Sequence, residues 1–121
     1  ESQEQLVIHQ RRADDIGNAG ADAASYSAGK AGVVALTRSA AQTYGEHGVR
    51  VNALLPGATD TKFASTLVKN PAILEKALEH IPMNRIAQPD EMAGAILYLA
   101  SPAASYTTGT CLNVDGGYLL A

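Results

Sequence analysis

The sequence predicts an α/β protein with a single parallel sheet. A long helical segment precedes an apolar strand, two further helical segments follow, and a short strand comes last. Strands that alternate with helices in this way are typical of parallel sheets. The chain has 121 residues, 46% of them hydrophobic and 17% charged, which is enough to build the core of one domain. No internal repeat or linker divides it.

The first 24 residues differ in character from the rest. Residues 6–8 form a short apolar patch that predicts a strand, while the remainder of segment 1–24 is polar and typical of a loop. Ser25 is a favourable N-cap, so we expect a helix from Tyr26 to about His47. Small residues are dense along it, which indicates close packing of another backbone, as at a subunit contact. The helically spaced residues are Val33, Leu36, Thr37, Ala40, Ala41 and Tyr44.

Gly48 is expected to end this helix. Residues 49–55 are almost continuously apolar, as in a strand that is covered on both faces, and Pro56-Gly57 ends that strand. We expect residues 58–70 to be a loop with some helical character.

The last third of the chain predicts two helices and a strand. One helix runs from Pro71 to Ile81, and a second begins with Pro89 at its first position and continues to about Ala100. The strand covers residues 110–114, and Asp115-Gly116-Gly117 follows as a turn in which the aspartate acts as a cap.

Composition excludes several classes of protein. The net charge is −3 and the nine basic residues are scattered, so we expect no nucleic-acid partner and no membrane surface. The three histidines share no ligand spacing and there is one cysteine, so no metal site is expected. Cys111 lies in a predicted strand, where we expect it to be buried and inert. The longest apolar run, residues 92–100, is too short to span a bilayer, and no signal peptide opens the sequence, so we expect a cytoplasmic protein.

Tyr26 and Lys30 are the residues best suited to chemistry. Positions i and i+4 share one face of a helix. The Lys30 ammonium would therefore favour the Tyr26 phenolate and lower its pKa from the ordinary value of about 10. Such a phenol can exchange a proton with a carbonyl or an alcohol. The alternative is an ordinary pair on a solvated helix face, and the spacing alone does not decide between them.

The pair belongs to an ordered series of motifs that resembles the C-terminal half of the classical short-chain dehydrogenase/reductase family over residues 25–121. The resemblance implies the C-terminal half of a doubly wound, Rossmann-like parallel sheet, with three helices and two to three strands. The motifs are Tyr26-Ser27-Ala28-Gly29-Lys30, Leu36-Thr37-Arg38-Ser39, Gly48-Val49-Arg50-Val51-Asn52-Ala53, Pro56-Gly57, Ile81-Pro82-Met83 and Gly109 through Gly117.

The resemblance also implies roles for individual residues. Tyr26 matches the catalytic acid/base, and Lys30 matches the lysine that assists it and binds the nicotinamide ribose of NAD or NADP. Both are expected to take part in cofactor binding. Pro56-Gly57 matches the turn that borders the nicotinamide. Thr59 falls where a backbone contact to the carboxamide is usual, and Thr61 where a hydroxyl meets the carboxamide or a phosphate.

Residues 62–86 match the helices that cover a small alcohol or carbonyl substrate in this family. The resemblance implies that apolar side chains here line a substrate pocket, and ordinary core packing is the alternative. The candidate side chains are Phe63, Leu67 and Met83.

The sequence also departs from the family pattern. Ala13 stands where the family usually has a serine that polarises the substrate carbonyl. The glycine-rich cofactor half of the family is missing, and with it the strand that selects NAD or NADP. Asn18-Ala19-Gly20 echoes a family motif only superficially, because it lies too close to Tyr26.

Three interpretations therefore remain open. The first is an NAD(P)-dependent oxidoreductase that transfers hydride between cofactor and an alcohol or carbonyl substrate. The second is a truncated, non-catalytic remnant that acts as an oligomerising or binding module. The third is complementation, in which a separate chain supplies the nucleotide-binding half. The family resemblance implies a homo-oligomer, a dimer or tetramer, in which a partner chain buries the apolar tail 118–121.

Overall fold

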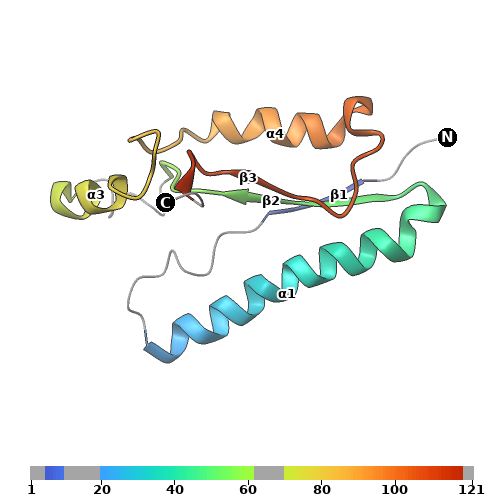
Figure 1. Cartoon of the computed structure of the whole chain (residues 1–121), viewed down its shortest axis with the longest axis horizontal. Helices are drawn as coiled ribbons and strands as arrows, with labels where there is room; N and C mark the ends of the chain where they lie inside the picture. Colours follow the sequence, from blue (N-terminus) through green and yellow to red (C-terminus); the bar gives the residue numbers. More distant parts are fainter. Residues whose placement is uncertain (1–4, 10–19, 62–69, 119–121) are drawn as a thin grey trace.

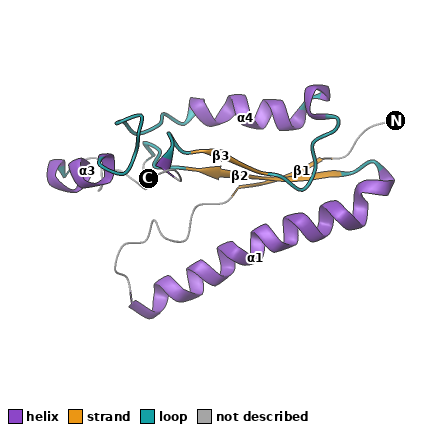
Figure 2. Cartoon of the chain, viewed as in Figure 1, coloured by secondary structure: helices purple, strands orange, loops and turns teal. Residues whose placement is uncertain are grey.

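A parallel sheet between two helices forms the centre of the fold. The computed structural model describes residues 5–9, 20–61 and 70–118. Strands β1 (Gln5–His9), β2 (Arg50–Pro56) and β3 (Cys111–Val114) lie in the order β1-β2-β3, and both pairings are parallel. Helix α1 lies on one face and α4 on the other (Figures 1 and 2). This arrangement confirms the predicted α/β class and the partial doubly wound sheet.

Strand β2 is the middle of the sheet and the centre of the core. Its residues Val51, Ala53 and Leu54 are at most 2% exposed, as the continuous apolar run predicts. The register pairs Ala53 with Cys111 on one side and with Ile8 on the other. The strand at residues 6–8 is thereby confirmed as part of β1. Strand β3 begins at Cys111, which is half-buried rather than buried as predicted, because β3 has a neighbouring strand on only one side in the described sheet.

Helix α1 (Gly20–Tyr44) begins earlier than predicted. Ser25 lies inside the helix and is not its N-cap, because the alanine-rich stretch before it favours helix strongly enough to extend the helix back to Gly20. The helix also ends before the predicted His47. Residues Gly45–His47 form the 3-10 turn η2, and Gly48 closes it with a φ of 77° that glycine adopts freely.

One strip of α1 packs against β2. Thr37 is fully buried and its hydroxyl donates to the Val33 carbonyl at 2.8 Å, while Ala41 is 6% exposed. Leu36 and Tyr44 are 60% and 51% exposed, so part of the apolar pattern of the helix does not face the sheet.

Two shorter helices follow β2. Helix α3 (Pro71–Leu78) starts at Asn70, whose side chain accepts a hydrogen bond from the Ala72 amide at 3.2 Å. It ends before the predicted Ile81, because the chain turns there through backbone hydrogen bonds and a positive φ at Asn84. Helix α4 (Asp90–Ala100) has Pro89 just before its first residue, and the 3-10 turn η3 (Pro102–Ala104) follows it.

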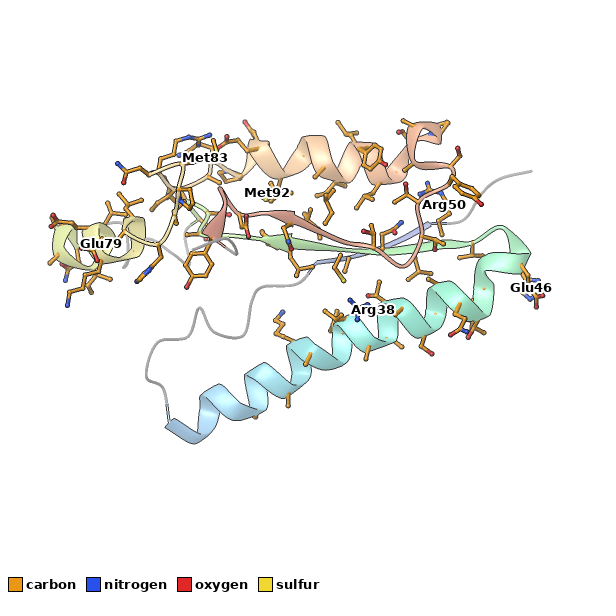
Figure 3. All side chains as sticks on the ribbon, viewed as in Figure 1. Arg38, Glu46, Arg50, Glu79, Met83 and Met92 are labelled. Atoms are coloured by element: carbon orange, nitrogen blue, oxygen red, sulfur yellow. The ribbon has the colours of Figure 1, made fainter. Side chains whose placement is uncertain are left out.

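Two polar side chains of β2 hold the connection from α4 to β3. The buried Arg50 guanidinium donates to the carbonyls of Leu99 at 2.8 Å, Thr107 at 3.3 Å and Ser101 at 3.4 Å (Figure 3). Asn52, fully buried, donates to the same Thr107 carbonyl and accepts from the Thr110 amide. The Leu99 carbonyl in the last turn of α4, which lacks a partner within the helix, is satisfied in this way.

In the described ranges, no helix combines the length and the apolar character that crossing a membrane requires.

Replacing Arg50 with alanine should destabilise the fold by about 2–4 kcal/mol, because the substitution leaves the buried Leu99 carbonyl without a donor and removes the buried side chain that links β2 to α4. Arg50→Lys should recover only part of the lost free energy of unfolding, since one ammonium cannot reach all three carbonyls at once. The measurement is urea unfolding, with the exposed Arg38→Ala as a control that should change stability by less than about 0.5 kcal/mol. Equal stability of Arg50→Ala and Arg38→Ala would contradict this role.

Candidate functional site

Three segments meet where β2 and β3 end. They are residues 57–60 after β2, residues 81–87 between α3 and α4, and residues 115–117 after β3, and we call them the three-loop cluster. The Gly57 amide donates to the Val114 carbonyl at 2.9 Å, and the Met83 amide donates to the Gly116 carbonyl at 3.1 Å. Motifs that are far apart in the sequence, Pro56-Gly57 among them, thus come together at the edge of the sheet where α/β proteins bind ligands.

At Gly57 the loop after β2 approaches the turn after β3 very closely. A β-carbon at Gly57 would lie 2.6 Å from the Asp115 Cα, so any side chain there would collide with backbone. Gly57 and the preceding Pro56 are both buried. The Asp115 Oδ1 accepts from the Gly117 amide at 3.0 Å, which confirms that this aspartate caps the turn.

Thr59 continues the chain beyond β2 in an extended conformation. Its side chain is 7% exposed and its hydroxyl donates to the Gly57 carbonyl at 3.0 Å. An isolated parallel bridge pairs Thr59 with Ala87, through the Asp60 amide and the Ala58 carbonyl. In such a bridge the N–H and C=O of Thr59 itself point away from Ala87. Within the described ranges no hydrogen bond involves the Thr59 amide, so a donor and an acceptor face the other side.

A shallow cavity of about 80 Å³ opens between the cluster and α4. Ala58, Val114 and Met92 form apolar parts of its wall, and Met92 lies on the side of α4 that faces the sheet (Figure 3). Met83, 59% exposed, also lines it. Phe63 and Leu67, the other predicted pocket residues, lie outside the described residues.

An ion pair fastens the 81–87 segment to α4. Arg85 donates to both carboxylate oxygens of Glu91, at 2.7 and 2.6 Å, and the Gln88 amide donates to Glu91 Oε2 at 2.8 Å. The Arg85 hydrogen bonds, followed by the Gln88 amide and the Arg85 charge, lower the pKa of Glu91 from 4.5 to about 2. Sequence reasoning missed this pair. The spacing of Gln88 and Glu91 before an apolar helix resembles a capping box and could have indicated Glu91.

The predicted acid/base pair belongs to α1. Tyr26 and Lys30 are one turn apart on this helix, as predicted, and Lys30 is half-buried. The side chain of Tyr26 lies outside the described residues, as does Ala13, so the geometry of the pair stays a prediction. Thr61 is exposed and ends the described range 20–61. In the described part of the chain, no three His, Cys, Asp or Glu residues gather as metal ligands would.

The Arg85–Glu91 pair predicts a pH dependence of stability. Because the pKa of Glu91 is depressed in the folded chain, its contribution is fully present above about pH 4.5 and is lost as the pH falls through about 2. Glu91→Gln removes the ionisable group and should flatten this part of the profile. The measurement is urea unfolding of both proteins between pH 2 and 6, and parallel profiles would contradict the assignment.

Comparison with known proteins identifies relatives over most of the chain. The family model described as enoyl-(acyl carrier protein) reductase matches residues 13–119 and so begins before residue 25, the first residue of the span that carries the resembling motifs. Galactitol 2-dehydrogenase (L-tagatose-forming) of Cereibacter sphaeroides is 49% identical over 79% of this chain and 38% of that protein. A 3-oxoacyl-[acyl-carrier-protein] reductase of Synechocystis is 43% identical over 87% of this chain and 40% of that protein. The chain thus spans about two fifths of these curated relatives.

Solved structures agree with these matches. A gluconate 5-dehydrogenase from Burkholderia cenocepacia, in complex with NADP and tartrate, superimposes with a TM-score of 0.87 at 28% identity and covers 98% of this chain and 46% of that one. A 4-hydroxyisoleucine dehydrogenase complexed with NADH, 24% identical, has the same fold with a TM-score of 0.88 over 97% of this chain and 47% of that one. The sequence motifs, the partial parallel sheet and these matches together establish that the chain belongs to the short-chain dehydrogenase/reductase family.

Proposed function

We propose that this chain forms the nicotinamide and proton-transfer side of an NAD(P)-dependent oxidoreductase that acts on small alcohols and carbonyl compounds. The observation that carries the proposal is the Thr59 backbone, which presents a donor and an acceptor at the carboxyl edge of β2. The Burkholderia relative with NADP bound supports the choice of cofactor. Because the chain covers about two fifths of its relatives, the activity of a whole protein is part of this proposal.

The turn after β2 suits a nicotinamide carboxamide. A carboxamide has one carbonyl oxygen and one amino group, which the Thr59 N–H and C=O can bind together. The Pro56-Gly57 turn is the proposed border of the nicotinamide, and the Thr61 hydroxyl is the proposed second contact to the carboxamide or a phosphate. The bound cofactor supplies hydride transfer, and the protein supplies orientation and acid/base help.

The proposed catalytic residues are Tyr26 and Lys30. The phenol of Tyr26 gives a proton to the substrate oxygen during carbonyl reduction and takes one during alcohol oxidation. The Lys30 ammonium, one helical turn away, stabilises the phenolate by charge and binds the ribose hydroxyls. No carbonyl-polarising serine is part of the proposal, since Ala13 occupies the corresponding sequence position.

We also propose self-association through α1 into a dimer or tetramer. Ala28, Gly29 and Gly32 are exposed along this helix, and Leu36 is 60% exposed. Small residues beside an exposed apolar side chain let a second helix approach closely and bury apolar surface.

The second candidate function is a non-catalytic module that binds through its sheet. In the described sheet β1 has β2 as its one neighbour, so among the described residues no strand pairs with its other edge. Such an edge pairs readily with a strand of another chain. This module would associate without any affinity for NAD(P)H.

The two functions separate in a titration of the 121-residue chain with NADPH and NADH, followed by nucleotide fluorescence, with oligomeric state measured by light scattering. If the chain has the proposed enzyme function, we expect saturable binding of NADPH or NADH. Lys30→Ala should weaken it by about tenfold, the cost of losing one charged hydrogen bond. Tyr26→Phe, which removes a hydroxyl of the same proposed site, should also weaken binding.

Lys76→Ala, an exposed lysine of α3, is the matched control and should leave binding unchanged. Association without binding of either nucleotide would reject the enzyme proposal for this chain and favour the module.

A further inference from the structure

We propose that the Asp115–Gly117 turn is a positioning element that sets the spacing between the cofactor-side loop 57–60 and the substrate-side segment 81–87. The assignment of these two sides rests on the proposed function. Asp115 and Gly116 also line the shallow cavity beside α4, but the role proposed for the turn is to hold the two loops. The turn acts by direct backbone contact with both loops.

The first contact is with the cofactor-side loop. The Gly57 position approaches the Asp115 Cα so closely that a β-carbon would lie 2.6 Å from it, and 2.9 Å from the Asp115 Cβ. Contacts this short leave no side chain between the two backbones to absorb a shift. The hydrogen bond from the Gly57 amide to the Val114 carbonyl, at 2.9 Å, fixes how the two segments align along the sheet. A displacement of Asp115 would therefore move the loop that holds Thr59.

The second contact is with the substrate-side segment. A β-carbon at Gly116 would lie 2.9 Å from Ile81 Cγ2, and one at Gly117 would lie 3.0 Å from Pro82 Cγ. The Gly116 carbonyl accepts from the Met83 amide at 3.1 Å. Ile81 is 4% exposed, so this contact is part of the core and cannot move aside freely. The same turn thus touches both loops.

The conformation of the turn is set locally. Gly116 and Gly117 have φ of 65° and 89°, which glycine tolerates and other residues adopt with strain. The Asp115 carboxylate holds this conformation by accepting from the Gly117 amide. Loss of that acceptor should loosen the turn and, through it, both loops.

The experiment measures amide hydrogen exchange by NMR in two matched pairs of variants. Gly116→Ala is compared with Gly48→Ala. Gly48 has a similar positive φ and lies at the opposite end of β2, and a β-carbon there would have no atom within 4 Å. Asp115→Ala is compared with Asp115→Asn, which keeps an acceptor oxygen. The readouts are the Gly57 and Met83 amides, with the Gly109 amide, bonded to the Val51 carbonyl at 2.7 Å, as the remote reference.

We expect Gly116→Ala and Asp115→Ala to speed exchange at both Gly57 and Met83 by about tenfold relative to Gly109, the effect of weakening one hydrogen bond. Gly48→Ala and Asp115→Asn should leave that ratio near the wild-type value. Acceleration at only one loop, or an equal effect of Gly48→Ala, would overturn the proposal, because it would show independent loops or general destabilisation.

A titration with NADPH on the same samples separates this proposal from the proposed function. If the wild-type chain binds NADPH, Gly116→Ala should weaken binding by about tenfold and Gly48→Ala should not. If the wild-type chain binds no nucleotide, the proposed function fails, and the exchange pattern still decides whether the turn couples the two loops. Unchanged NADPH affinity in Gly116→Ala, with binding intact in the wild type, would overturn the positioning role.

Discussion

The buried Arg50 guanidinium is the constraint on which the rest of this fold depends. It joins the first residue of the central strand to the carbonyls that end α4 and to the segment that leads into β3. A cation in the interior is tolerated when its donors meet well-placed acceptors, and the negative end of a helix provides them. Arg50 therefore fixes where α4 ends relative to β2, and Asn52 fixes where β3 begins.

This constraint reaches the candidate site through strand register. Once Ala53 pairs with Cys111, Pro56 must pair with Val114, because parallel strands advance in step. The residues just beyond both strands then meet edge to edge, which leaves no room for a side chain at Gly57. A polar anchor at one end of the sheet thus determines a backbone contact at the other end, where the three-loop cluster lies.

Local sequence patterns predicted which helices and strands form better than they predicted the residues at which these begin and end. The apolar run of β2 gave the strand to within one residue, because a strand covered on both faces has few polar positions. The start of α1 was wrong because Ser25 suits an N-cap, yet the alanines before it suit helix as well. Where two local preferences compete, burial and packing against distant residues decide where a helix begins. A short stretch of sequence does not contain that information.

The same division applies to the site. Tyr26 and Lys30 could be predicted as a pair because helical periodicity relates residues four apart. Gly57 could be predicted only as a turn glycine, since its need to be glycine comes from Asp115, far away in sequence. Arg85 and Glu91 likewise meet across a turn of irregular backbone. Local periodicity therefore predicts which residues are candidates for chemistry, while non-local backbone contacts set the geometry of the candidate site.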